Sequence, residues 1–557
     1  SRAAVETLAI IAYHQPVTRA EIEEIRGVAL SQGPLDTLLE ANWIRPKGRR
    51  RTPGRPITWV TTDAFLDHFG LESCDALPGI DELKAAGLLD AGSAISRIGA
   101  QALAATLMTN VVYPLTCRGS WVRHFTPGRA WDSWYTWDSG FIGLGLAEID
   151  VERAIDCLCA YLCPPGDPHA AFCHHGSPMP VQFLLAQDLW NRTRDCGLLA
   201  HVFPRLVQYQ RFLMGRLGGS TTRSLASGLI RTWDYFYNSG GWDDYPPQKR
   251  VHAEGLAAST APAVSSSLVA RCGRILAGFA RILGREDAAV EFERDAADLV
   301  AALEAHAWDE QAGIYGYVRH DAAGRPCGLL CDATGVNANL GLDGTSPLLT
   351  GGIDAGRAAR LIAALGDERR FLTPVGVSTV DRTAPYYRHD GYWNGAVWMP
   401  HQWFLWKALL DWGEGALAHR IAGIALRTWQ TEVERTGFCW EHFMIESGRG
   451  AGWHQFGGLS APVVAWFGAY HRPWRLTGGF DCWILDQQAT ADGARWSLRL
   501  DGRRDGMATV VVAVPQGRPH RATWRGTPVT ARVVLPGALD LSLSAGDGDG
   551  VLRIDLV

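Results

Sequence analysis

The chain has 557 residues, a net charge of −5 and a charged content of 20%. This length exceeds what one hydrophobic core covers, so we expect two to four domains of an ordinary globular protein. The net charge gives no general reason for binding to nucleic acid or membranes, and no apolar run is long enough to predict a membrane span. The chain begins at Ser1, and the sequence alone does not exclude a leader peptide.

Residues 1–90 predict a winged-helix module. Helices are expected at 5–13, 19–26 and 35–42, and strands at 44–51 and 56–61 flank a basic turn. Thr18 and Glu21 have the spacing of a capping box at the start of the second helix. The basic turn would suit DNA, but acidic residues outnumber basic ones over the whole segment, so we do not expect nucleic-acid binding.

This segment resembles the second winged-helix domain of bacterial segregation and condensation protein B. The resemblance runs to about residue 89 and rests on the blocks ETLAIIAY at 6–13, QPVTRAEI at 15–22, IRG at 25–27, GRR at 48–50, TPGRP at 52–56 and FLDHFGL at 65–71. It implies an adaptor that contacts a kleisin subunit of a condensin-type complex.

Residues 97–477 predict a helical domain rich in tryptophan. Amphipathic helices are expected at 151–162, 181–193, 204–217, 265–283, 287–306, 355–365, 396–412, 415–432 and 459–470. Aromatic, glycine-rich loops lie between them at 131–138, 233–245, 386–393 and 438–455. A helical barrel whose loops share one mouth explains this layout, and a superhelical array explains the periodicity equally well. Because indole rings stack on sugar rings, many of the 23 tryptophans favour a carbohydrate pocket over a purely structural core.

Two loops carry carboxyl groups suited to glycoside hydrolysis, which needs one acid and one base or nucleophile. The first, NSGGWDDYP at 238–246, places Asp243 and Asp244 beside aromatic rings, which we expect to bury the acid and raise its pKa. The second, GFCWEHF at 437–443, contains Glu441, and Glu446 competes with it. The residues alone leave the choice within each pair open, and a solvated turn or a Glu bonded to a backbone amide is the structural alternative.

A cluster of cysteines and histidines invites a metal site. It comprises Cys157, Cys159, Cys163, Cys173, His174 and His175. The spacing matches no standard zinc pattern, so we expect small apolar cysteines on a buried helix and no bound metal.

Residues 99–484 resemble glycoside hydrolase family 63, including processing α-glucosidase I and mannosylglycerate hydrolases, and more distantly trehalases. The resemblance rests on WDSGF at 137–141, GWDDYP at 241–246, YW at 392–393 with Gly395 and Trp398, WE at 440–441, and GRG at 448–450 through HQF at 454–456. Asn394 and Pro247 replace arginines that many members carry, so the sugar and the leaving group stay open.

The resemblance implies an (α/α)6 toroid and an inverting, exo-acting hydrolase for α-glucosidic or α-mannosidic bonds of small oligosaccharides or glycosyl-glycerates. Asp243 would be the general acid and Glu441 the general base. The sugar site would be lined by Trp131, Trp137, Asp138, Trp242, Tyr392, Trp393, Trp398 and Gln455. The partner of this domain is a small carbohydrate, with no metal or organic cofactor.

Residues 478–557 predict a small β-sandwich, with strands at 495–500, 508–514, 529–535 and 551–557. The whole chain is thus expected to be mainly α. The alternative function is a chromosome-segregation adaptor acting through residues 1–90, with the toroid as scaffold or the chain as the product of a chimeric gene. The adaptor-like first module favours the cytoplasm.

Overall fold

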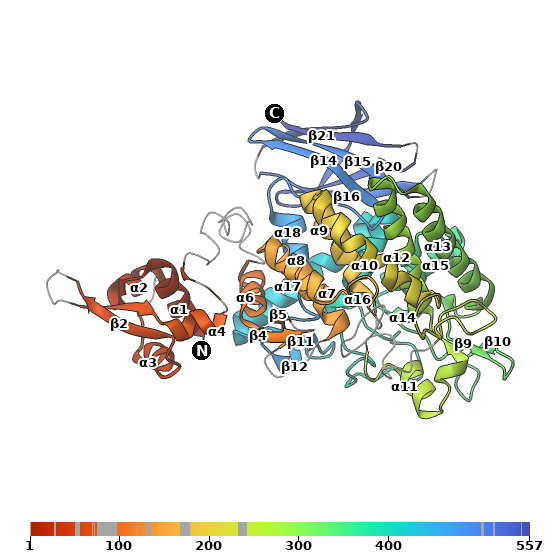
Figure 1. Ribbon diagram of the computed structural model, residues 1–557, viewed down its shortest axis with the longest axis horizontal. Helices are drawn as coiled ribbons and strands as arrows, with labels where there is room; N and C mark the ends of the chain where they lie inside the picture. The colour runs from red at the N-terminus through yellow and green to blue at the C-terminus, as the bar shows by residue number, and fades with distance from the viewer. Residues whose placement is uncertain are drawn as a thin grey trace.

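The computed structural model describes residues 2–26, 29–50, 56–69, 71, 73–74, 97–117, 120–128, 131, 135–167, 179–231, 242–502, 506–515, 518–546 and 548–557. Helices predominate, short strands are scattered through the central region, and the larger sheets lie at the C-terminal end of the chain (Figure 1). None of the described helices combines the length and the apolar character needed to cross a bilayer.

The N-terminal module has three helices and a small sheet, as predicted, followed by a short helix. Its elements are α1 (Arg2–His14), β1 (Val17–Thr18), α2 (Arg19–Arg26), α3 (Gln32–Glu40), β2 (Ile44–Arg49), β3 (Ile57–Thr61) and α4 (Asp63–Phe69). The sheet is antiparallel in the order β1-β3-β2. The capping box is confirmed, because the Thr18 amide donates to Glu21 Oε2 at 2.6 Å and the Glu21 amide donates to Thr18 Oγ1 at 3.3 Å.

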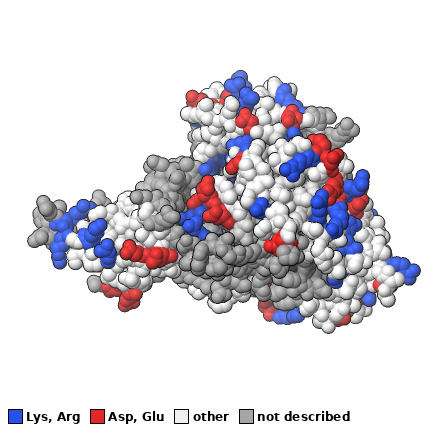
Figure 2. All heavy atoms as spheres, viewed as in Figure 1, with Lys and Arg blue, Asp and Glu red and all other residues white. Residues whose placement is uncertain are grey.

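Charge on this module is segregated. Arg45, Lys47, Arg49 and Arg50 are exposed, and Lys and Arg side chains gather at the end farthest from the rest of the chain (Figure 2). Part of this charge is neutralised within the module, because Arg50 lies 3.1 Å from Glu21. The predicted basic turn at 51–55 lies outside the described residues.

The central region is helical. Its long helices are α6 (Arg97–Thr109), α7 (Thr136–Leu146), α8 (Val151–Ala160), α9 (Val181–Thr193), α10 (Cys196–Leu213), α12 (Ala263–Ile282), α13 (Glu286–His306), α15 (Ala355–Gly366), α16 (Met399–Asp411), α17 (Gly415–Thr436) and α18 (Pro462–His471). Sequence neighbours pack in pairs, as α7 with α8, α12 with α13 and α16 with α17. One continuous hydrophobic core draws buried residues from all of these helices.

Among the predicted helix starts, the largest error is at α10. We predicted a helix beginning at Pro204, but α10 begins at Cys196 and carries Pro204 in its interior. The start is set by Asp195, whose Oδ1 accepts hydrogen bonds from the amides of Gly197 at 2.7 Å and Leu198 at 3.0 Å. This N-cap satisfies the first helical donors, and the helix continues through the proline.

Helix α7 is buried along its whole length. A Cβ added at Gly140 would lie 2.5 Å from Val181, and one at Gly143 would lie 2.2 Å from Leu185, so both glycines permit close approach of α9. This packing fixes the N-terminal turn of α7, which contains Trp137 and Asp138.

The C-terminal residues form two antiparallel sheets, seen at the top of Figure 1. One has the order β13-β16-β20-β19 (Leu476–Thr477, Met507–Ala513, Ala538–Ser544, Ala531–Leu535). The other has the order β14-β15-β21-β17-β18 (Cys482–Thr490, Gly493–Leu500, Gly550–Leu556, His520–Trp524, Thr527–Val529). Both sheets contribute buried residues to a core of their own, which includes Trp496, Val510 and Leu541.

Candidate active site

Three carboxyl groups from distant parts of the chain interact electrostatically. Asp138 lies in the first turn of α7, Asp243 lies just before α11 (Pro246–Ala253), and Glu441 lies on β11 (Trp440–Phe443). Burial raises the pKa of Asp138 well above its usual range, and the charges of Glu441 and Asp243 raise it further. Both effects favour the protonated form of Asp138, which can donate a hydrogen bond.

Glu441 is buried and held at both carboxylate oxygens. The hydroxyl of Tyr392 donates a hydrogen bond to Oε1, and the amide of Trp453 donates to Oε2 at 3.2 Å. Burial raises the pKa of Glu441, the two hydrogen bonds oppose this, and the charge of Asp243 raises it again. The competing Glu446 is exposed on the turn that follows β11. The structure therefore distinguishes the two carboxyls: Glu441 is buried with both oxygens held, and Glu446 is exposed.

The hairpin of β11 and β12 (Gly450–His454) makes room for this carboxylate through a glycine. Gly452 has a φ of +78°, and a Cβ there would lie 2.2 Å from Glu441 Oε2. His442 Nδ1 lies 3.9 Å from the same oxygen. Because burial lowers the pKa of His442 to about 4, this contact is not an ion pair at neutral pH.

The adjacent carboxyls of Asp243 and Asp244 occupy different environments. Asp244 Oδ1 accepts a hydrogen bond from the Trp393 amide at 2.5 Å, which ties the two loops together. Asp243 is exposed and interacts electrostatically with Glu441. The prediction that aromatic rings bury the acid carboxyl is wrong for Asp243, because the ring of Trp242 turns into the core. The segment 232–241 lies outside the described residues.

Two aromatic stacks adjoin the carboxyl groups, because Trp242 precedes Asp243 in the chain and Trp398 packs on Tyr392, which donates to Glu441. The Trp242 ring stacks on His401, with centroids 3.9 Å apart, and on Tyr245 at 4.3 Å. Trp393 stacks on Trp398 at 3.6 Å. The tryptophan rings of both stacks are fully buried. They therefore form a rigid floor rather than an open stacking face for a sugar.

The remaining predicted residues lie around this floor. Trp137 packs against Trp393, with ring centroids 6.0 Å apart. Trp131 is partly buried and lies perpendicular to the exposed ring of Trp453. Gln455 has a φ of +55°, and its Oε1 accepts a hydrogen bond from the Thr106 hydroxyl at 3.3 Å.

Sequence reasoning missed His401, His442, Gly452 and Trp453. His401 follows Trp398 by three residues at a helix start, a spacing that places both on one face. Gly452 and Trp453 fall inside the block 448–456 that carried the family resemblance. The contacts of Gly452 and Trp453 with Glu441 depend on the register of the hairpin, in which Trp440 lies opposite His454 and His442 opposite Ala451.

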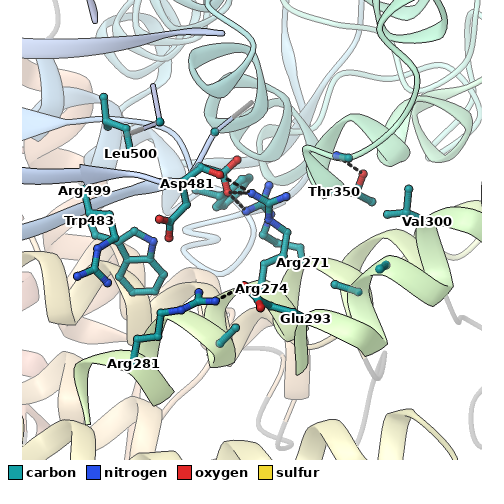
Figure 3. A pocket seen from close by; sticks show the side chains of 18 of the residues that line it. Arg271, Arg274, Arg281, Glu293, Val300, Thr350, Asp481, Trp483, Arg499 and Leu500 are labelled. Atoms are coloured by element: carbon teal, nitrogen blue, oxygen red, sulfur yellow. Dashed lines mark hydrogen bonds and ion pairs between the residues drawn. The ribbon is translucent and has the colours of Figure 1, made fainter. Parts of the chain in front are cut away.

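A separate cavity of about 950 Å³ lies between α12, α13 and the C-terminal strands (Figure 3). Arg271 and Arg274 both donate hydrogen bonds to Asp481 there, at 2.5 and 2.9 Å. Its described lining includes none of the candidate site residues. The described residues contain no cluster of metal-ligating side chains; Cys173, His174 and His175 lie outside them.

The helical fold and the carboxyl groups beside stacked indoles agree with the comparisons, which indicate a glycoside hydrolase. The family model for the mannosylglycerate hydrolase MGH1-like glycoside hydrolase domain matches residues 131–457, and the chain belongs to this family. It is a glycosidase. A second family model, for segregation and condensation complex subunit ScpB, matches residues 1–80.

Solved structures share the fold at low sequence identity. A glycoside hydrolase family 63 mannosylglycerate hydrolase from Thermus thermophilus, in complex with glucose, is 20% identical, with a TM-score of 0.50 over 66% of this chain and 99% of that chain. A sialidase is 13% identical, with a TM-score of 0.53 over 87% of this chain and 46% of that chain. At these identities the likeness concerns the fold alone.

Curated relatives named segregation and condensation protein B match the N-terminal module. Segregation and condensation protein B from Desulforamulus reducens is 55% identical over 87 residues, which are 16% of this chain and 48% of the relative. The protein of the same name from Caldanaerobacter subterraneus is 57% identical over 81 residues, 14% of this chain and 48% of the relative. The chain thus spans about half the length of these relatives.

Proposed function

We propose that this protein is an inverting, exo-acting hydrolase for α-glucosidic or α-mannosidic bonds of small oligosaccharides or glycosyl-glycerates. The observation that carries the proposal is the setting of Glu441, a buried carboxylate held by Tyr392 and the Trp453 amide and coupled electrostatically to the exposed Asp243. Family membership supports the reaction class.

Asp243 is the general acid of this mechanism and Glu441 the general base. Asp243 protonates the glycosidic oxygen as the bond to the anomeric carbon breaks. Glu441 accepts a proton from a water molecule that attacks the same carbon from the opposite face, so the product anomer is inverted. Asp138, whose protonated form is favoured by burial, contacts a sugar hydroxyl in this mechanism.

We further propose that residues 97–477 close into an (α/α)6 toroid, with a winged-helix module at 1–90 and a β-sandwich at 478–557. Ring closure is supported by contacts between the first and last helices of the region, because α6 packs on both α17 and α18, and α7 packs on α18. The Gly99 amide also donates to Gln430 Oε1 at 3.0 Å. A superhelical array would leave these helices apart.

The test is hydrolysis of α-linked glucosides, mannosides and glycosyl-glycerates by the full chain, with NMR of the first-formed product. We expect the inverted β-anomer first, and a first-formed α-anomer contradicts the mechanism. The Glu441→Gln variant should lose roughly 10³-fold in kcat. Glu446→Gln is the matched control, because Glu446 is exposed on the same hairpin, and it should keep wild-type activity.

A second candidate function is favoured by the N-terminal identity to segregation and condensation protein B. Residues 1–90 would then bind a kleisin subunit, with the helical domain as scaffold. Co-purification of the full chain with a co-expressed kleisin subunit tests this idea. Capture by wild type that is lost on deletion of residues 1–90 supports it, and equal capture by both chains contradicts it.

A further inference from the structure

An exposed indole stands beside the candidate base. The side chain of Trp453 is 48% exposed, whereas the tryptophans of the aromatic floor are fully buried. A single exposed hydrophobic residue is ordinary on a protein surface, so exposure alone does not indicate a function. Any function of Trp453 has to be argued from its position.

The backbone fixes that position. The amide of Trp453 donates a hydrogen bond to Glu441 Oε2. The residue that bears the exposed indole therefore also holds the candidate base in place. Glu441 is buried and Trp453 is exposed, so along this hairpin the indole lies nearer to solvent than the carboxylate. In an exo-acting enzyme the glycosyl residue enters the buried end, and the leaving group stays at the exposed end.

The Trp453 ring is also oriented by its neighbours. It lies perpendicular to the Trp131 ring, with centroids 6.1 Å apart and an angle of 84°. Trp131 is in turn perpendicular to Tyr135, at 5.9 Å and 81°. Edge-to-face packing of this kind restrains each ring while leaving a face available for another flat apolar surface.

We propose that Trp453, braced by Trp131, binds the leaving group and selects an α-glycoside whose leaving group is a pyranose ring. This rests on the proposed function and chooses between its two substrate classes. A pyranose presents an apolar C–H face that stacks on an indole, whereas glycerate is small and charged and offers no such face.

Two arginines on the described part of the neighbouring loops agree with this choice, because a glycerate carboxylate would need a cationic partner. Arg449, on the same hairpin, donates to Glu432 Oε2 at 2.9 Å. Arg388, on the loop of Tyr392, pairs with Asp390 at 3.1 Å. Both arginines are thus already engaged by carboxylates of the chain.

The experiment compares three substrates with one glycosyl group: an α-linked disaccharide, an α-glycosyl-glycerate and an α-glycosyl fluoride. Fluoride departs without protonation and has no face to stack. We expect wild type to prefer the disaccharide to the glycerate in kcat/KM. Trp453→Ala should lower kcat/KM for the disaccharide by roughly tenfold to a hundredfold, as for loss of one apolar substrate contact, and leave the fluoride nearly unchanged. Trp453→Phe should restore part of the loss.

Phe438→Ala is the matched control, because Phe438 is 39% exposed on the approach to β11 and packs on His454 at 5.1 Å. This variant should not alter the ratio of kcat/KM for the disaccharide to kcat/KM for the fluoride. Equal losses on fluoride and disaccharide in Trp453→Ala overturn the proposal, since the ring would then act through Glu441. Unchanged disaccharide hydrolysis, or a wild-type preference for the glycerate, also overturns it. Wild type inactive on all three substrates contradicts the proposed function itself.

Discussion

The backbone amide of Trp393 donates a hydrogen bond to Oδ1 of Asp244 at 2.5 Å. This bond ties the segment before α11 to the loop before α16, and it gives Asp244 a structural task. Its neighbour Asp243 is exposed, close enough to Glu441 and Asp138 for its charge to raise their pKa values. We therefore expect substitution of Asp243 and substitution of Asp244 to have different effects on activity.

Asp243→Asn should lower kcat for an α-glycoside with a poor leaving group by roughly 10² to 10⁴-fold, the usual contribution of a general acid. Hydrolysis of the α-glycosyl fluoride should survive, because fluoride needs no proton to depart. Steady-state kinetics on both substrates measure the difference.

Asp244→Asn provides the control, since an asparagine Oδ1 still accepts the bond from the Trp393 amide. It should remain close to wild type in activity. A reversed pattern, with Asp244→Asn inactive and Asp243→Asn active, would reassign the acid.

Tyr392→Phe should shift the pH profile. The Tyr392 hydroxyl donates to Glu441 and lowers the pKa of that carboxyl, which burial raises. Removing the bond raises the pKa further, so the base becomes protonated at a higher pH. The acid limb of the kcat/KM profile should therefore move to higher pH, while the fold is retained. A limb that stays in place, or moves to lower pH, contradicts the assignment of Glu441 as base.

The limits of sequence reasoning are visible at these residues. The loops that carry the carboxyls were predictable from their aromatic and glycine content, and Thr18 with Glu21 was predictable because a capping box is local. The distinction between Asp243 and Asp244 depends on a bond across 149 residues of sequence. Local composition does not encode such a contact. Likewise, indoles suggested stacking faces for sugar, but tertiary packing buries Trp242 completely.

Gly452→Ala should lower kcat by roughly 10²-fold without unfolding the enzyme. The added Cβ would lie 2.2 Å from Glu441 Oε2, so the base must move, and a displacement near 1 Å costs roughly 10²-fold in rate. Because Gly452 is exposed, the backbone of the hairpin can shift to accept the methyl group without unfolding the protein. Gly448→Ala introduces similar backbone strain, at a φ of +64°, but its Cβ would meet only Val375 at 4.0 Å. Comparable activity of the two variants would show that strain, not displacement of Glu441, causes the loss.

Arg271→Met should destabilise the protein strongly. Arg271 is fully buried on α12 (Figure 3). It donates a hydrogen bond at 2.5 Å to Asp481, the residue that precedes β14. Without Arg271, the buried carboxylate of Asp481 loses one of its positively charged partners. We expect this loss to lower the free energy of unfolding by about 3–5 kcal/mol. Arg281→Met is the control, because its pair with Glu293 on the same cavity wall is partly exposed and contributes less than about 1 kcal/mol. Urea unfolding followed by tryptophan fluorescence measures both. Equal midpoints for the two variants would mean that Arg274, which also donates to Asp481 at 2.9 Å, suffices to hold it.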